Sequence, residues 1–369
     1  MFGINSNLFN KITSIHKTKY TNKLQSNPSL QETKNDVFIK PKQTITYETD
    51  KNGKPILQLI QVGNKSEVQT LDGQPLYTHT KVGNKINETV YSYNGNKLYE
   101  KETLPNNAYT KTIYESDGTT INSIIKVDDE GNIESKEIIN TSPTNITDET
   151  KNNLPEYLYH FTSEENYKAI MESGEMQATY SDTFLKKNGN KAIFLVDSDN
   201  LLNHWDSLKD GTRHSYLIRL LKFCDKNRNG NVVMLKIPTS KLNIDNLSFR
   251  NQNYVMDSFA MMRLPKETRK KFFACSKLIS KIYNEAKYFE DDISSHIFMP
   301  KKMEHLENGC SISKLQEHSS EPYEILYSTN ISSDLIESAT TIDISSIQNM
   351  PMYDEEAEQI SKELIKNAL

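Results

Sequence analysis

The stretch TITYETDKNGKPILQLIQVGN, residues 44–64, sets the pattern for the N-terminal part of the chain. Two strand-length runs rich in β-branched and apolar residues, 44–47 and 57–60, flank the dipeptide Asn52-Gly53. Asn-Gly readily adopts the positive φ angles of a type I′ turn. The stretch therefore predicts a β-hairpin.

The same pattern recurs along residues 43–140. Similar turn dipeptides follow at intervals of about 20 residues: Asp72-Gly73, Asn94-Gly95 and Asp117-Gly118. Weaker turn signals lie between them: Gly63-Asn64, Gly83-Asn84 and Asn106-Asn107. We expect an all-β meander of about four hairpin repeats, each too small to bury a core alone. Because many of its strands are polar on both faces, we expect a spacer, stalk or binding surface.

The composition limits the class of protein. Of 369 residues, 36% are hydrophobic and 25% are charged, and the net charge is -5. A globally basic nucleic-acid binder is therefore disfavoured. No apolar run approaches the ~18 residues of a membrane helix, so no membrane span is expected. Three cysteines are too few for a disulfide framework, which favours a reduced, soluble protein.

Two polar segments flank the repeats. Residues 1–42 contain seven lysines and two acidic residues, and they predict a basic, flexible arm. The arm has no continuous apolar stretch, so we expect a cytoplasmic protein, or one secreted without an ordinary signal peptide. Residues 141–153 are polar and turn-rich and predict a linker.

Residues 154–345 change to a mixed α+β pattern. Short strands are expected at 157–161, 192–196, 216–221, 232–237 and 324–327. A capping box of Thr162 and Glu165 predicts a helix that ends at Gly174. Asp197 is expected to begin another helix, and residues 346–369 predict a C-terminal amphipathic helix. Few long helices among short strands favour α+β over a doubly wound sheet.

Metal motifs are weak in this part of the chain. Residues 225–230 begin like a calcium loop, but Lys236 stands where a bidentate Glu is required, so a hairpin turn is preferred. Four residues were weighed as zinc ligands: His296, His305, Cys310 and His318. Their spacing matches no compact zinc site, and no metal is expected.

Three segments carry a family resemblance. The first is LYHFTS at 158–163, before the capped helix; the second is KAIFL at 191–195; the third is PYEILY at 322–327. In this order they resemble the core strands of the ADP-ribosyltransferase superfamily, over roughly residues 155–340. The resemblance implies a split β-sheet domain, NAD as the cofactor and transfer of ADP-ribose, a glycosyltransferase reaction.

The resemblance also implies roles for particular residues. Glu324 would be the catalytic carboxylate, and His160, with Thr162 or Ser163 nearby, would hold a ribose hydroxyl of NAD. Phe194 and Trp205 would stack on the nicotinamide ring. The chemistry agrees, because cleavage of the nicotinamide bond passes through an oxocarbenium-like centre that a buried carboxylate stabilises.

Simpler interpretations remain open for the same residues. His160, Phe194 and Trp205 also fit core positions, and Glu324 also fits an edge-strand charge. Phe194 stands where the His-Tyr-Glu subgroup has tyrosine. Pro322 stands where arginine-modifying members carry a second acidic or amide residue, so arginine modification is disfavoured.

A basic helix is predicted between residues 263 and 287. Phe272, Cys275 and Ile279 form an apolar face. Four lysines form a separate stripe that suits contact with phosphates: Lys266, Lys270, Lys277 and Lys281. An ordinary solvated helix face is the preferred explanation of this stripe, because lysines usually lie exposed.

The leading hypothesis is a bacterial toxin or effector that transfers ADP-ribose from NAD to a macromolecular target, protein or nucleic acid. The alternative is a catalytically inactive binding module of the same fold that uses the β-repeats as its interaction surface. RNA 2′-phosphotransfer ranks last, because that family's arginine clamp would have to come from the scattered Arg213, Arg219 and Arg250.

Overall fold

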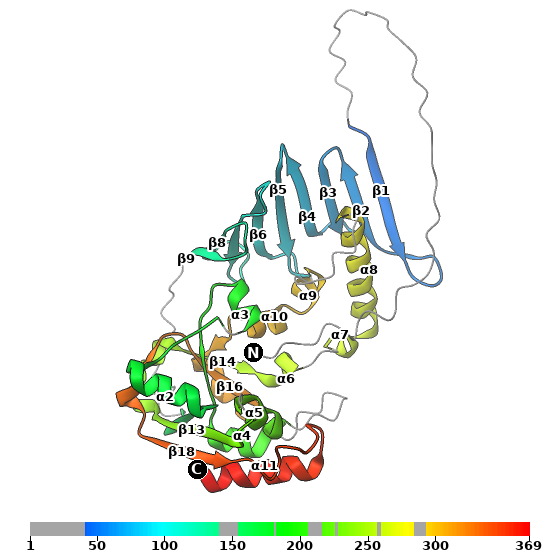
Figure 1. Cartoon of the computed structure of the whole chain (residues 1–369). Coiled ribbons are helices and arrows are strands. Elements are labelled where there is room, and N and C mark those ends of the chain that lie inside the picture. The colour runs from blue at the N-terminus through cyan, green and yellow to red at the C-terminus, as the bar shows by residue number, and fades with distance from the viewer. Residues whose placement is uncertain are drawn as a thin grey trace, which may run out of the picture.

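The protein is described by a computed structural model that covers residues 41–139, 154–180, 182–205, 216–225, 228–256, 260–283 and 293–369 (Figure 1). The predicted linker and nearly all of the predicted basic arm lie outside these residues. Within them, no helix is both long and apolar enough to cross a membrane.

The predicted meander is confirmed as a nine-stranded antiparallel sheet whose strands are neighbours in chain order. Its strands are β1 (Gln43–Thr49), β2 (Pro55–Val62), β3 (Lys65–Gln69), β4 (Pro75–Val82), β5 (Lys85–Tyr91), β6 (Lys97–Thr103), β7 (Tyr109–Tyr114), β8 (Ile121–Val127) and β9 (Ile133–Ile138). Gly118 has a φ of +72°, and a Cβ there would lie 2.6 Å from the backbone nitrogen of Lys97. This turn therefore requires glycine.

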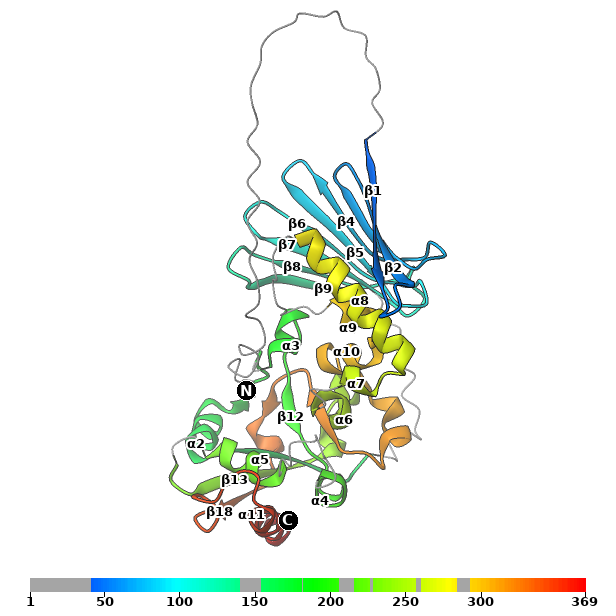
Figure 2. The ribbon, with the colours of Figure 1, turned by 90° about the vertical axis from the view of Figure 1, so that its right-hand side faces the viewer.

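One face of this sheet is apolar, contrary to the expectation of polar strands on both sides. Alternate residues such as Leu57, Val68 and Val90 are buried beneath helices α8 (Lys266–Tyr283) and α9 (Ile293–Phe298). Helix α8 lies across the strands in both views (Figures 1 and 2). The predicted apolar face of this helix is confirmed, since Phe272 and Cys275 pack against the sheet.

The C-terminal part is built on small sheets. One has the order β10 (Tyr157–Ser163), β13 (Asn231–Pro238), β18 (Ser338–Asp343) and is called here the β10 sheet. The other has the order β12 (Ile193–Leu195), β16 (Tyr323–Tyr327), β14 (Leu247–Asn251), β15 (Cys310–Ser311) and is called the β16 sheet. A two-stranded pair joins β11 (Glu175–Met176) to β17 (Ile331–Ser332).

Helices surround these sheets. They are α2 (Glu164–Ser173), α3 (Thr183–Lys187), α4 (Ser198–His204), α5 (Tyr216–Cys224), α6 (Gln252–Met256), α7 (Ala260–Arg263), α10 (Pro300–Glu307) and α11 (Glu355–Ala368). Short 3-10 turns occur at η3 (Thr239–Lys241), η4 (Ile244–Asn246), η5 (Ile312–His318) and η6 (Ser333–Leu335). The mixed α+β class expected for this part is confirmed.

Two cores hold the small sheets in place. The first lies between them and combines Leu158 and Leu235 of the β10 sheet with Phe249 and Ile325 of the β16 sheet. The second lies on the other face of the β10 sheet, under α4, α5 and α11. Glu358 of α11 accepts two backbone N–H groups at the start of α5, at 2.9 and 2.8 Å, where a helix favours negative charge.

Several local predictions need correction. The strand expected at 216–221 is wrong: α5 is a helix whose buried Leu217 and Leu221 lie on one face. A short apolar run does not distinguish the two structures by itself. Residues 225–230 connect α5 to β13, so they are not a turn between two strands. The cap of α2 is Ser163, one residue after the expected position.

A buried carboxylate at the interface between α8 and the sheet gives a test of this packing. Glu88 Oε1 accepts a hydrogen bond from Tyr77 at 2.6 Å and another from Tyr283 of α8. Glu88→Ala removes the acceptor that the Tyr77 and Tyr283 hydroxyl groups share, and only one of the two can then donate to the other. We expect the free energy of unfolding in urea to fall by about 1–3 kcal/mol.

The matched control is Glu102→Ala, on the next strand. Glu102 pairs with Lys85 at 2.9 Å, but both side chains are about half exposed. Exposed pairs are worth about 0–1 kcal/mol. Equal destabilisation by the two substitutions would show that Glu88 does not hold α8 to the sheet.

Candidate functional site

The register of the β16 sheet gathers polar residues on one face. Phe194 of β12 lies opposite Leu326 of β16, and Arg250 of β14 lies opposite Glu324. Side chains two positions apart on a strand share a face. Phe194, Leu326, Glu324 and Arg250 therefore lie on the same side, facing away from the core between the two small sheets.

Arg250 is the most buried of these polar side chains, at 1% exposure. Its guanidinium donates to both carboxylate oxygens of Asp182, at 3.1 and 3.3 Å, and to the carbonyl of Leu306 at 2.6 Å. Asp182 also caps α3 by accepting two backbone N–H groups. The arginine thus fixes α3, β14 and α10 relative to one another. Its guanidinium carbon lies 5.7 Å from the centre of the Phe194 ring.

Glu324 is held less tightly than Asp182. Its Oε1 lies 3.7 Å from Nη1 of Arg250, and its side chain is 12% exposed. Burial raises the pKa of Glu324 to about 7, against the opposing effect of the Arg250 charge. The carboxyl group therefore changes its charge near neutral pH, as suits an acid–base or charge-stabilising role.

Two buried donors beside Glu324 are unsatisfied. Nε of Arg250 and Nε2 of Gln252 have no hydrogen-bond partner of ordinary geometry within the described part of the chain. The Gln252 side chain nevertheless lies close enough to Glu324 to lower the pKa of that carboxyl group. Buried donors usually have acceptors, so Nε of Arg250 is a departure from ordinary packing beside Glu324.

His160 is connected to this face through the backbone. Its Nδ1 lies 2.9 Å from the carbonyl oxygen of Phe194. A carbonyl only accepts, so Nδ1 carries the proton and Nε2 of a neutral ring is left as an acceptor. Burial lowers the pKa of His160, which favours that neutral ring. Thr162 is buried nearby in β10, and the Ser163 hydroxyl is used to cap α2.

Trp205 lies in the packed interior. It is 1% exposed, and its Nε1 donates to Oδ1 of Asn200 at 2.9 Å. Its ring meets Tyr216 edge-on at 4.2 Å. Burial and then the nearby Glu324 charge raise the pKa of Tyr216. The structure therefore places Phe194 and Glu324 on one face of the β16 sheet and joins His160 to the backbone of Phe194. It gives Trp205 a packing position in the core under α4 and α5.

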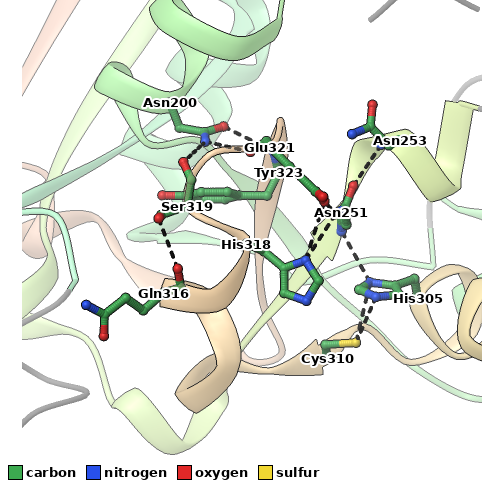
Figure 3. Close-up of polar contacts among 10 residues, drawn as sticks. All are labelled: Asn200, Asn251, Asn253, His305, Cys310, Gln316, His318, Ser319, Glu321 and Tyr323. Atoms are coloured by element: carbon green, nitrogen blue, oxygen red, sulfur yellow. Dashed lines mark hydrogen bonds and ion pairs between the residues drawn. The ribbon is translucent and has the colours of Figure 1, made fainter.

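A second polar cluster lies at the end of β14, where Asn251 follows Arg250, and is drawn in Figure 3. Asn251 donates its backbone N–H to Nδ1 of His305 at 3.2 Å, and its side chain contacts His318 and Glu321. The sulfur of Cys310 lies 3.2 Å from Nε2 of His305. Three of the four residues weighed as zinc ligands thus meet here.

The folded protein favours the neutral forms of His305 and Cys310 in this cluster. Burial lowers the pKa of His305 to about 4 and raises that of Cys310 to about 12. A neutral thiol is a weak nucleophile and a poor metal ligand. His296, the fourth residue, lies apart and contacts Glu307 at 2.8 Å. In the described ranges, no three His, Cys, Asp or Glu side chains are placed to hold one metal ion.

The predicted lysine stripe is partly engaged by the sheet. Lys277 and Lys281 lie 3.7 and 2.6 Å from the carboxylate of Glu48 on β1. Lys270 pairs with Glu267 on its own helix at 2.7 Å. The two pairs with Glu48 help to hold α8 on the sheet, and they reduce the charge that this stripe offers to phosphates.

Sequence reasoning missed the residues that surround Glu324. Arg250 was considered only as one of three scattered arginines, and Asp182 and Gln252 were not singled out. The local sequence offered little signal, because Arg250 falls on the polar position of the alternating strand LSFRN at 247–251, as in an ordinary half-exposed strand.

No protein-family model matches this chain, and no curated protein matches it.

The His305 cluster makes folding sensitive to acid. The folded protein favours neutral His305, with a pKa of about 4, against an ordinary value of 6.5. Between pH 6.5 and 4 the unfolded chain binds more protons at this site, so its contribution to stability is present above pH 6.5 and is lost as the pH falls. We expect the free energy of unfolding in urea to fall as the pH is lowered from 6.5 to 4. We expect this fall to be smaller in His305→Gln.

His204→Gln is the control, because His204 lies on α4 outside the cluster. A pH dependence that is the same in wild type and His305→Gln would contradict the assignment.

Proposed function

We propose that the C-terminal part of this protein is an ADP-ribosyltransferase-like enzyme that cleaves NAD at its nicotinamide bond and transfers ADP-ribose to a macromolecular target. The observation that carries the proposal is the placement of Phe194 and Glu324 on one face of the β16 sheet, with His160 bonded to the Phe194 carbonyl. Two small facing sheets also fit the split β-sheet domain implied by the family resemblance.

Each residue has a chemical task in this reaction. The ionised carboxylate of Glu324 would stabilise the positive charge that develops on the ribose ring. The free Nε2 of His160 would accept a hydrogen bond from a ribose hydroxyl, for which its neutral tautomer is suited. Phe194 is partly exposed and would stack against nicotinamide. Arg250 would keep Glu324 ionised, since its charge lowers the pKa of that carboxyl.

One observation favours the alternative of a catalytically inactive module. The Arg250 guanidinium lies over the Phe194 ring, where nicotinamide would stack in the proposed enzyme. Nicotinamide and this guanidinium would then have to share Phe194, by binding opposite faces of its ring. A module in which Arg250 occupies that place permanently would not bind NAD, and calorimetric titration with NAD separates the two functions.

The central test is nicotinamide release from NAD, with and without cell lysate. Glu324→Gln keeps the shape of the side chain and removes its charge. We expect release to fall by about 10²–10³-fold, the usual effect of losing one preorganised charge at a reaction centre. Stimulation of the wild type by lysate would support transfer, and the labelled component would identify the target.

Glu337→Gln is the matched control, because Glu337 is a partly exposed carboxylate that pairs with Lys236 at 3.0 Å. Unchanged NAD turnover in Glu324→Gln would contradict the role of Glu324. If no nicotinamide is released under any condition and NAD does not bind, the catalytically inactive module is the remaining function.

The pH profile offers an independent test. If only ionised Glu324 supports the reaction, release should rise with pH and reach half its plateau near pH 7, the pKa of this group. Arg250→Gln removes the charge that lowers this pKa, so the rise should move to higher pH. Circular dichroism checks that the variant is folded, and an unmoved midpoint in a folded variant would contradict the coupling.

A further inference from the structure

A cavity of about 290 Å³ lies where the last strand of the nine-stranded sheet meets the β16 sheet. Three separate parts of the chain form its wall. They are β9 with Lys136 and Ile138; the segment before β12 with Tyr180, Leu185, Gly189, Asn190, Lys191 and Ala192; and the β14–β16 side with Ser248, Asn308, Leu326 and Ser328. The cavity therefore depends on the packing of the sheet against the C-terminal part.

The lining is positively charged. It contains two lysines, Lys136 and Lys191, and none of its residues is acidic. Nζ of Lys136 donates to the side-chain oxygen of Asn190, a neutral acceptor. Burial lowers the pKa of Lys136 to about 8, and no charged group of the described residues offsets this effect. A partly buried ammonium group without a counter-charge favours an anion in the space beside it.

The neighbouring amides hold this arrangement in place. Nδ2 of Asn190 donates to the carbonyl of Glu307 at 2.9 Å and to Oδ1 of Asn308 at 3.1 Å. These two bonds fix which end of the Asn190 amide faces Lys136. Gly189 has a φ of +68°, and a Cβ there would lie 3.0 Å from Cδ of Lys136. The backbone thus approaches the lysine stem more closely than a larger residue would allow.

The rest of the cavity is apolar and aromatic. Leu185, Ala192 and Leu326 are buried together and form its floor, with Phe194 packed against them. Tyr180 stands at the side, with Nζ of Lys191 5.0 Å from the centre of its ring. An inorganic anion alone would leave this surface without a partner, whereas an ester with a small apolar body would cover it.

We propose that this cavity binds a phosphate monoester with a small apolar or aromatic body. The two ammonium groups match the double charge of a phosphate monoester, and lysine recognises phosphate as a point charge. The apolar floor and Tyr180 would hold the organic body. The volume is at the lower end for small-molecule sites. This inference goes beyond the proposed NAD chemistry and does not depend on it.

The experiment uses the full chain and phenyl phosphate, with binding measured by calorimetry at pH 7 and low salt. We expect Lys136→Met to weaken binding at least tenfold, and Lys191→Met to weaken it as well. Lys126→Met is the matched control, because Lys126 is exposed on the neighbouring strand β8 and points to the opposite face from Lys136. We expect no change in this control.

Inorganic phosphate is the second probe, and we expect it to bind more weakly than phenyl phosphate. Equal affinity for the two probes would overturn the assignment of an ester, and no binding of phenyl phosphate at millimolar concentration would overturn the site. Lys136→Met should not lower the thermal midpoint of the free protein, because it removes a buried charge without a counter-charge. Normal folding with unchanged phenyl phosphate affinity in Lys136→Met would also overturn the proposal.

Discussion

A fully buried arginine sets the arrangement of the C-terminal part. Taking a guanidinium out of water costs several kcal/mol unless its charge and donors are matched. Arg250 meets most of this requirement through its two terminal nitrogens, which contact Asp182 and the carbonyl of Leu306 from elements far apart in the sequence. Glu324 lies within reach of the same charge. The positions of α3 and of the end of α10 thus follow from one side chain, which also opposes the effect of burial on the pKa of Glu324.

A similar constraint joins the nine-stranded sheet to the rest of the chain. Its inner face carries apolar residues where α8 lies, and lysines where the segment before β12 approaches. Lys111 and Lys136 donate to Asn188 and Asn190 of that segment. Burial raises the pKa of Glu307 close by, but the charges of His296 and Lys111 lower it by more, so the net pKa is below its usual range. The sheet is therefore packed against two regions of the C-terminal part.

The parts of the fold set by local chemistry were predictable from sequence. Asn-Gly and Asp-Gly turns define hairpins within a few residues, so a meander of about four hairpins followed directly, without the ninth strand. Helix α5 was missed because its short apolar run also fits a strand. Its burial under α11 depends on contacts between residues far apart in the sequence. The surroundings of Glu324 were missed for the same reason. Arg250 becomes its neighbour only through the pairing of β14 with β16, which no local pattern specifies.

The way these charges are satisfied bears on whether the Glu324 face has a function. A cluster that served stability alone would place its short bonds where the charges are most buried. Here Arg250 directs its bidentate contact to Asp182, and it leaves Glu324 at 3.7 Å with a pKa near 7. Nε of Arg250 is also without a partner among the described residues, at a cost of about 1–3 kcal/mol. Departures from local consistency concentrate at functional sites, because selection retains them there for binding or reaction. The weakly held carboxylate of Glu324 therefore favours a functional site here over a purely structural ion pair.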